Sequence, residues 1–491
     1  MPLGPDPFLA TLSLIGMVII VAALLSGLIE RSGVPQVGVL LALGAVLGPY
    51  GLGLIDARLD SPVLRAVSTL SLALVLFTDA LSLDLAQIRR HVRLTLLVLG
   101  PGTLLSAVLV ALMAGSLLGL PWPAAAVLGA ALASTDPVLL RGLLRRPDLP
   151  PAARLALRLE SGLNDVVLLP IVLVAMALSG VRLMETPRSW GSLGLDLFII
   201  GPGAGVAVGL LGVATLDLVR RRIGIRRDYE SLYSLGIAFA AFAAAEAVHG
   251  SGFLAAFAAG MTISVFDVEL CDCFQEYGET TAEMTLLFTF VLLGSSLIWT
   301  GFAGAGLREA LFAVAVVVIR PIVFLVSLWP TRLDRQSLRL ISWFGPRGLS
   351  SLLLVLVTVF AGMPGSDRLF ALCSLVVLLS VVLHGGSVML LQKRDRNEPP
   401  PPRPAVAEAP EERPSEPAAA PDVPEKVDVP GMLRLQSAGE PVIVLDVRTD
   451  RSRDTSGQIA AGTVRLDPER AVEEAERLQL PREAWLVAFC A

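Results

Sequence analysis

Long apolar segments separated by short polar gaps make up most of this chain. Runs of about 18 or more apolar residues recur up to residue 392, and such a run is long enough to cross the hydrocarbon core of a bilayer as an α-helix. The gaps are short, which predicts a compact helical bundle. The pattern predicts about 13 spans, near residues 8–29, 34–55, 64–84, 93–119, 123–143, 156–179, 193–219, 230–248, 251–267, 282–299, 305–328, 337–362 and 368–391.

The pattern changes after residue 392. Residues 393–430 are rich in Pro, Ala and Glu and include four consecutive prolines at 399–402, which predicts a disordered linker. The chain therefore divides into a transmembrane domain at 8–392, this linker and a C-terminal segment at 431–491. That segment predicts a small α/β piece, with a strand at 441–448, an amphipathic helix at 468–479 and a strand at 485–490.

The composition agrees with a polytopic all-α membrane protein. Of the 491 residues, 54% are hydrophobic and 17% are charged, whereas soluble domains carry about 25% charged residues. The four cysteines suggest neither a disulfide framework nor a zinc site of four ligands. No segment resembles a nucleotide-binding loop. We therefore expect no cofactor, no nucleic-acid partner and no ATP-driven pump; the expected partners are the lipid bilayer and transported ions.

Basic residues predict the orientation. They cluster in gaps that follow odd-numbered spans, which places them on one side of the membrane, and the positive-inside rule assigns that side to the cytoplasm. The N-terminus is then outside and the C-terminus inside the cell membrane. The basic residues that support this prediction are Arg89, Arg90, Arg93, Arg141, Arg145, Arg146, Arg154, Arg158, Arg220, Arg221, Arg222, Arg226, Arg227, Arg332, Arg335, Arg339, Lys393, Arg394 and Arg396.

The most polar stretch within a span is 160–165, Glu-Ser-Gly-Leu-Asn-Asp. A charge at the centre of a membrane helix costs roughly 2.5–3.5 kcal/mol on insertion scales, so such residues are expected to face a partner, an ion or a cavity. Ser161 and Asp165 are four residues apart and share a helix face, which predicts oxygen ligands for a hard cation such as Na⁺. A polar patch that packs one helix against another is the alternative interpretation.

Two other spans are predicted to break. In Ser-Thr-Asp-Pro at 134–137 the proline removes a helix donor and excludes Asp136 from the α-region, although a simple proline kink is the alternative. Gly-Pro-Arg-Gly at 345–348 interrupts a later span. Paired broken helices in two halves of a transporter indicate its binding site. Asp136 is expected to neutralise half-helix N–H ends and Arg347 half-helix C-termini, with spans 1–6 and 8–13 as inverted repeats.

Glu160 is expected to have its own partner, because it lies beside the face that Asp165 occupies. Arg320 is the candidate, since it lies within an apolar span that offers no acidic neighbour. Buried charges require pairing. The sequence therefore predicts a Glu160–Arg320 ion pair.

Taken together, these motifs resemble the monovalent cation:proton antiporter-1 family of sodium/proton exchangers. The resemblance covers residues 8–392 and rests on 134–137, 160–165, Arg320-Pro321 and 345–348 in this order, with support from 74–84 and 250–255. It implies a 13-helix fold with two crossing broken helices, and a homodimer. One departure is Phe344-Gly345-Pro346, where the family commonly has Gly-Gly-Leu; the added proline is expected to stiffen the break.

The resemblance also implies roles for single residues. Asp165 takes Na⁺ or H⁺ in turn, Thr135, Asp136 and Ser161 supply or position further oxygens for Na⁺, and Asn164 steadies the site. Glu160 with Arg320 is a structural ion pair. Members with Asn-Asp, as at 164–165, are generally electroneutral. The implied function is secondary exchange of Na⁺, K⁺ or Li⁺ for H⁺ by alternating access, and not an enzymatic activity.

The C-terminal segment resembles the first part of a rhodanese-like domain. Val444-Leu445-Asp446-Val447-Arg448 matches its opening strand, and 487–490 matches the strand that leads to the nucleophilic cysteine. A rhodanese needs an anion-cradling loop after that cysteine, and the sequence ends one residue later, so we expect an incomplete and inactive domain. Two alternative functions remain at this stage. A channel or uniporter needs a continuous polar pore, and a membrane sensor needs an intact downstream domain.

Overall fold

The computed structural model describes residues 36–397, apart from 56, 84, 145, 147, 182–189, 223–226, 267–278 and 332, together with Gly16, Ile20 and short pieces of residues 432–489. The predicted span at 8–29 and most of the predicted linker lie outside the described residues. The chain divides into two units, Met1–Pro399 and Pro400–Ala491. Each unit is described by itself.

The first unit is built from helices. They follow one another with short connections, in the order α2 (Gln36–Leu47), α3 (Pro62–Ser82), α4 (Leu85–Arg90), α5 (Val92–Leu97), η1 (Val98–Leu104), α6 (Leu105–Leu118), α7 (Trp122–Ala133), α8 (Pro137–Leu144), α9 (Pro151–Leu178), α10 (Trp190–Leu195), η2 (Asp196–Ile200), α11 (Gly201–Arg222), α12 (Arg227–Ala247), α13 (Gly252–Phe266), α15 (Glu279–Ser295), η4 (Leu297–Trp299), α16 (Thr300–Ala303), α17 (Leu307–Ser327), α18 (Arg335–Trp343), α19 (Leu349–Phe360) and α20 (Ser366–Asn397).

These helices confirm the predicted all-α polytopic class. Every predicted span from 34–55 onward corresponds to one of them or to a consecutive set of them. Among the described residues, 7 helices are long and apolar enough to cross a membrane. Shorter apolar helices accompany them, including α2, α13 and α19.

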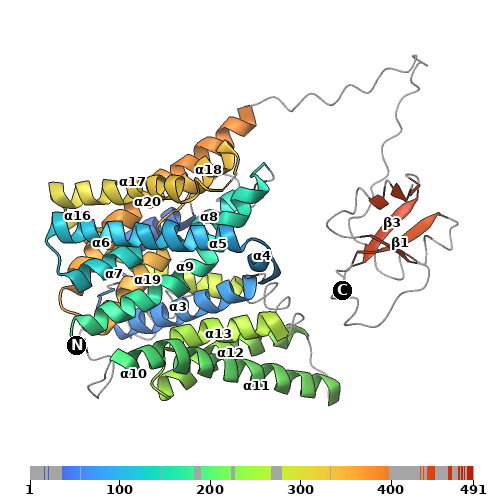
Figure 1. Ribbon diagram of the computed structural model, residues 1–491, viewed down its shortest axis with the longest axis horizontal. Helices are drawn as coiled ribbons and strands as arrows, with labels where there is room; N and C mark the ends of the chain where they lie inside the picture. Colours follow the sequence, from blue (N-terminus) through green and yellow to red (C-terminus); the bar gives the residue numbers. More distant parts are fainter. Residues whose placement is uncertain are drawn as a thin grey trace. The chain divides into compact units, whose positions relative to one another are not determined.

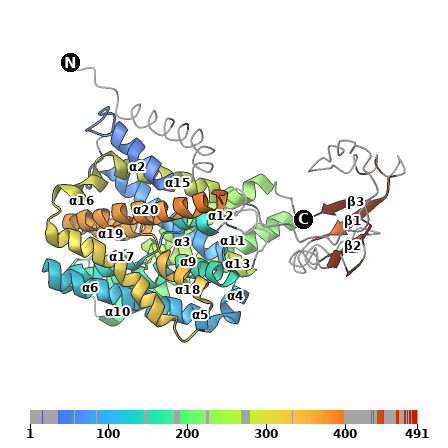
Figure 2. The same ribbon diagram turned by 90° about the horizontal axis from the view of Figure 1, so that it is seen from above.

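The helices run side by side in one bundle. Figure 1 shows α17, α6, α3 and α13 lying nearly parallel, and Figure 2 shows the same bundle turned by 90°. The largest apolar cluster joins α2, α3, α7, α9, α15, α19 and α20. Two further clusters join α3 with α11–α13, and η1 with α8, α9, α17 and α18. Helices α3 and α9 each take part in two of these clusters and so connect them.

Local sequence explains where several helices begin or bend. Prolines open α3 and α9, because the first turn of a helix needs no proline N–H. The Asp334 side chain caps α18 by accepting from Ser337 N at 2.8 Å, and this contact with Ser337 holds the pKa of Asp334 below its usual range. The π-helical turn η1 contains Pro101, whereas the sequence predicted an uninterrupted helix there. A proline removes one regular hydrogen bond, which a π-turn accommodates.

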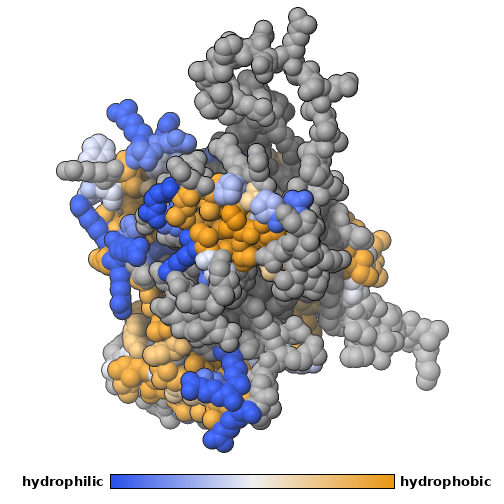
Figure 3. Space-filling view, turned by 90° about the vertical axis from the view of Figure 1, so that its right-hand side faces the viewer, coloured by the Kyte–Doolittle hydropathy of each residue, from blue (hydrophilic) through white to orange (hydrophobic). Residues whose placement is uncertain are grey.

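Exposed basic residues gather at one end of the bundle. Arg89 and Arg90 end α4, and Arg335 and Arg339 lie on α18. Figure 3 views the molecule from the right-hand side of Figure 1 and shows groups of hydrophilic residues (blue) beside apolar ones (orange). These four residues are among those from which the cytoplasmic side was predicted.

The second unit contains a three-stranded parallel sheet in the order β2-β1-β3. Strand β1 (Val442–Asp446) pairs with β3 (Trp485–Phe489) in the register Val442 to Trp485, and with β2 (Val464–Arg465) in the register Leu445 to Val464. Both predicted strands are therefore present, and β2 adds a third. Most of the predicted helix 468–479 and Cys490 lie outside the described residues. The rhodanese-like character of this unit stays a prediction.

Candidate functional site

Two broken helices cross at the centre of the first unit. Residues 134–136 separate α7 from α8, and residues 344–348 separate α18 from α19. Ser134 leaves the helix with ψ 136°, and the proline at 137 excludes the α-conformation from Asp136, the residue before it. The breaks touch directly, since Asp136 N donates to Pro346 O at 2.9 Å. Free backbone groups of both helices therefore meet in one buried place.

The Asp136 carboxylate caps both half-helices that begin at this crossing. Its Oδ1 accepts from Val138 N at 2.8 Å, in the first turn of α8. Its Oδ2 accepts from Leu349 N at 2.6 Å, at the start of α19. A carboxylate at a helix N-terminus satisfies orphan N–H groups and complements the helix dipole. Gly348 permits this approach, because a Cβ at that position would collide with Asp136 Oδ2.

Two arginines cap the half-helices that end at the crossing. Arg347 Nη1 donates to Ala133 O at 2.8 Å and to Ser134 O at 2.9 Å, at the end of α7. Arg320 caps α18 in the same way, by donating from Nη1 to two carbonyl oxygens near its end; the acceptors are Ile341 O at 2.9 Å and Ser342 O at 2.6 Å. Cations stabilise the negative ends of helix dipoles. Each of the four half-helix ends at the crossing therefore has a charged cap.

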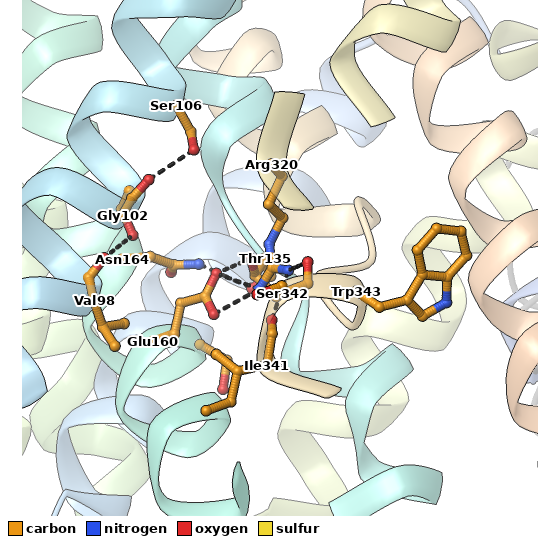
Figure 4. A network of polar contacts seen from close by, with 12 residues as sticks. Val98, Gly102, Ser106, Thr135, Glu160, Asn164, Arg320, Ile341, Ser342 and Trp343 are labelled. Carbon is orange, nitrogen blue, oxygen red and sulfur yellow. Dashed lines mark hydrogen bonds and ion pairs between the residues drawn. The ribbon is translucent and has the colours of Figure 1, made fainter. Parts of the chain in front are cut away.

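Asp136, Arg320 and Arg347 and the half-helix ends that they cap form a frame, and Glu160 on α9 is joined to this frame through Arg320. Arg320 Nη2 lies 2.7 Å from Glu160 Oε2 and 2.9 Å from Oε1, and both side chains are at most 2% exposed. Thr135 Oγ1 donates to Glu160 Oε1 at 2.8 Å and accepts from Arg347 Nη1 at 3.1 Å. Figure 4 shows Arg320 between Glu160 and the carbonyl groups of Ile341 and Ser342. The buried negative charge of Glu160 is thereby compensated.

Asp165 and Asn164 differ from this frame in their hydrogen bonding. Asp165 Oδ1 accepts from Ser134 Oγ at 2.5 Å, and Asn164 Nδ2 donates to Thr135 O at 3.0 Å. The second oxygen of each side chain, Asp165 Oδ2 and Asn164 Oδ1, is buried and receives no hydrogen bond from any described residue. Buried acceptors are normally satisfied, so each of these two oxygens is a free acceptor, and we refer to the two as the acceptor pair. Their chemistry suits a proton or a hard cation.

Ser161 lies differently from the sequence expectation. It is buried on α9 as predicted, but its Oγ donates back to Arg158 O at 3.4 Å. Serine side chains in helices commonly bond to a carbonyl of the preceding turn. The structure therefore brings Asp165, Asn164, Thr135 and Asp136 to the crossing, while the Ser161 hydroxyl points to its own helix backbone.

The structure adds residues to which the sequence assigned no role. Ser134 binds the Asp165 carboxylate, and Ser350 on α19 lies close enough to interact with it. Ser380 and His384 on α20 contact the second break. Ser134 carried a sequence signal, because it directly precedes the predicted break. The other three are polar residues within apolar helices, and their contacts with Asp165 and the second break form only when the helices pack.

The first unit is similar to known transporters in sequence. The family model described as sodium/hydrogen exchanger, transmembrane, matches residues 17–393. The chain is 25% identical over 383 residues to the K(+)/H(+) antiporter NhaP of Alkalimonas amylolytica, covering 77% of this chain and 65% of that protein. It is 26% identical over 394 residues to the K(+)/H(+) antiporter NhaP2 of Shewanella baltica, covering 78% and 66%. The chain thus spans about two thirds of these relatives.

The fold is also similar to that of a solved structure. The sodium proton antiporter MjNhaP1 from Methanocaldococcus jannaschii, determined at pH 8, superposes with a TM-score of 0.63 at 18% sequence identity. The match covers 78% of this chain and 100% of that one. At this identity the likeness concerns the fold, and it includes the helical bundle described above.

Proposed function

Because the chain belongs to the sodium/hydrogen exchanger transmembrane family, we propose that it exchanges a monovalent cation for H⁺ as a secondary antiporter. The observation that carries this proposal is the acceptor pair of Asp165 and Asn164. Asp165 is 2% exposed, its Oδ2 receives no hydrogen bond from any described residue, and its contacts come from hydroxyl groups. The Glu160 carboxylate, in contrast, is paired with an arginine, and the Asp136 carboxylate accepts from backbone N–H groups.

Exchange follows from competition for one carboxylate. A proton on Asp165 neutralises it, and a cation bound to Asp165 Oδ2 and Asn164 Oδ1 compensates its charge. An empty, charged Asp165 in a membrane interior is costly. If only the loaded forms pass between the two openings, uptake of one ion is obligatorily coupled to release of the other. Thr135 and Asp136 hold the crossing in place, and Ser161 supplies a further oxygen if its side chain turns.

The frame around Asp165 suits alternating access. Three charged side chains, Asp136, Arg320 and Arg347, bind the broken helices to one another and, through Glu160, to α9. Such a group moves as a rigid body against the rest of the protein, as in other transporters with broken helices. The remaining parts of the proposal are a cell-membrane location with the basic end in the cytoplasm, and a homodimer.

A vesicle assay tests the proposed function. Everted vesicles that contain the protein are acidified inside, and Na⁺, K⁺ or Li⁺ is added in turn while the internal pH is followed. We expect at least one of these cations to dissipate the pH gradient, and vesicles without the protein to show no such response. If none of the three cations releases protons at any pH between about 6 and 9, the proposal is wrong.

Competition predicts how the response depends on pH. Below the pKa of the shared carboxylate, each proton must leave before a cation binds, so the apparent KM for the cation is expected to rise by about tenfold for each unit of pH decrease. At higher pH, KM is expected to become constant. The measurement is KM for the best cation at a series of pH values equal on both sides. A KM independent of pH would show that cation and proton bind at different groups.

If exchange is electroneutral, its rate and equilibrium should not depend on the membrane potential. One carboxylate at 164–165 exchanges one H⁺ for one monovalent cation, so no net charge moves. If one net charge moved, a potential of about 100 mV would change the exchange equilibrium by about fifty-fold. We expect no change when a potential is imposed with valinomycin and a K⁺ gradient. The control uses Na⁺ or Li⁺ as substrate, with K⁺ kept below the concentration that drives exchange by itself.

A further inference from the structure

Two side chains of α20 contact the backbone on both sides of the second break. Arg347 N donates to Ser380 Oγ at 2.7 Å. His384, one turn further along α20, places Nε2 3.1 Å from Trp343 O, the last carbonyl of α18. Ser380 Oγ and His384 Nδ1 lie 3.0 Å apart. Ser380 is fully buried and His384 is 6% exposed, so these groups have little access to water.

The number of hydrogens on each group determines which group donates in each of these hydrogen bonds. The Arg347 N–H can only donate, so Ser380 Oγ accepts from it and turns its own hydrogen to His384 Nδ1. A neutral imidazole that accepts at Nδ1 carries its hydrogen on Nε2, and Nε2 then donates to Trp343 O. Nδ1 also lies 3.0 Å from Ser380 O, but a hydrogen on Nδ1 in the neutral ring would leave two acceptors, Nε2 and Trp343 O, facing each other. The Nε2–H tautomer therefore gives the neutral ring two hydrogen bonds, to Ser380 Oγ and Trp343 O, and leaves only the contact between Nδ1 and Ser380 O without a hydrogen.

We propose that Ser380 and His384 are positioning residues that hold Arg347 at the crossing and so set the geometry of the ion site. These hydrogen bonds from Arg347 N through Ser380 and His384, which we call the relay, fix the backbone at Arg347. The Nη1 of Arg347 in turn caps α7 and donates to Thr135 Oγ1. Thr135 in turn holds Glu160 through its hydroxyl and Asn164 through its carbonyl oxygen. A change at Ser380 or His384 therefore reaches the acceptor pair without touching it. This inference rests on the proposed antiport function.

Transport kinetics test the positioning role. In proteoliposomes with the full chain, Ser380→Ala and His384→Leu are each expected to raise the cation KM by about tenfold, the effect of losing a buried hydrogen bond. Both substitutions interrupt the same series of hydrogen bonds. The cation KM of the double variant is therefore expected to be no higher than that of the more impaired single variant. His384→Gln keeps a donor for Trp343 O and is expected to retain KM better than His384→Asn, which lacks that reach.

Ser374→Ala is the matched control. Ser374 is a fully buried serine of the same helix, and its hydroxyl has no hydrogen-bond partner among the described residues. The cation KM of Ser374→Ala is expected to stay within about twofold of that of the unmodified protein. An equal rise in KM for Ser374→Ala and Ser380→Ala would overturn the inference, because it would reveal a general packing effect. An unchanged KM for Ser380→Ala would overturn it as well.

The tautomer of His384 gives a second test that does not depend on transport. The chain has 3 histidines, so ¹⁵N-histidine labelling of the reconstituted protein yields few signals, and His384→Gln identifies the one from His384. We expect shifts typical of a neutral ring with its hydrogen on Nε2. A hydrogen on Nδ1 in the neutral ring would refute the relay. Absence of any cation-driven exchange by the unmodified protein, in contrast, would refute the proposed function and leave this spectroscopic test in force.

Discussion

Asp165→Asn is expected to abolish cation-driven proton exchange while leaving the amount of folded protein near that of the unmodified chain. Asparagine has nearly the same shape as aspartate, and its carbonyl oxygen can still accept from Ser134 Oγ. It cannot, however, take up a proton or offer a negative charge to a cation. The loss should therefore lie in turnover, by about a hundredfold or more, because no other group replaces the shared carboxylate.

The measurement is the initial rate of the pH change in everted vesicles, normalised to the amount of folded protein from fluorescence-detected size exclusion. Asp217→Asn is the control, since Asp217 is an exposed aspartate of α11 with an ordinary surface ion pair to Arg221. Substantial exchange by Asp165→Asn at saturating cation would remove Asp165 from the transport step.

The second large effect is expected at the buried ion pair. Breaking a buried pair by removing one partner costs about 3–5 kcal/mol, because an uncompensated charge is left behind. Glu160→Ala leaves the Arg320 guanidinium buried, and Arg320→Leu also removes the cap from Ile341 O and Ser342 O. We therefore expect both variants to reduce folded yield and thermal stability strongly, with the larger loss for Arg320→Leu.

The matched comparison is an exposed pair. Asp217 and Arg221 lie one turn apart with side chains 51% and 76% exposed, and such pairs contribute about 0–1 kcal/mol. Asp217→Ala should therefore leave yield and melting temperature nearly unchanged. Normal yield of Glu160→Ala together with lost transport would give Glu160 a direct part in ion binding instead of a structural one.

Hydrophobic pattern and proline placement predicted much of the architecture. The two breaks follow from Pro137 and Pro346, because proline cannot continue a helix and restricts its preceding residue. The lone Arg320 in an apolar span indicated a buried acidic partner, and the structure places Glu160 against it. Each of these predictions rests on a local free-energy cost, either a helix interrupted by proline or a buried charge without a partner. Few residues in the chain can offset such a cost, so the predictions located the right residues.

Predictions that depended on which side chains meet across helices were less complete. Ser161 shares a helical face with Asp165, yet its hydroxyl bonds to Arg158 O, since helix periodicity does not fix a serine rotamer. The double role of Asp136 required knowledge that Leu349 N lies beside it. His384 gave no sequence signal, because its contact with Trp343 O forms only after α18 and α20 pack together.

The charged caps of the crossing have a consequence for biosynthesis. Asp136 and Leu349 are 213 residues apart in the chain, and Arg347 and Ala133 are 214 apart. While the ribosome has not yet reached Arg347, the end of α7 lacks its arginine and Asp136 caps only α8. The ion site is therefore completed late, after most of the membrane domain has been inserted. A nascent chain that stops before residue 347 holds Asp165 beside the first break only, while the second break and α19 are still missing.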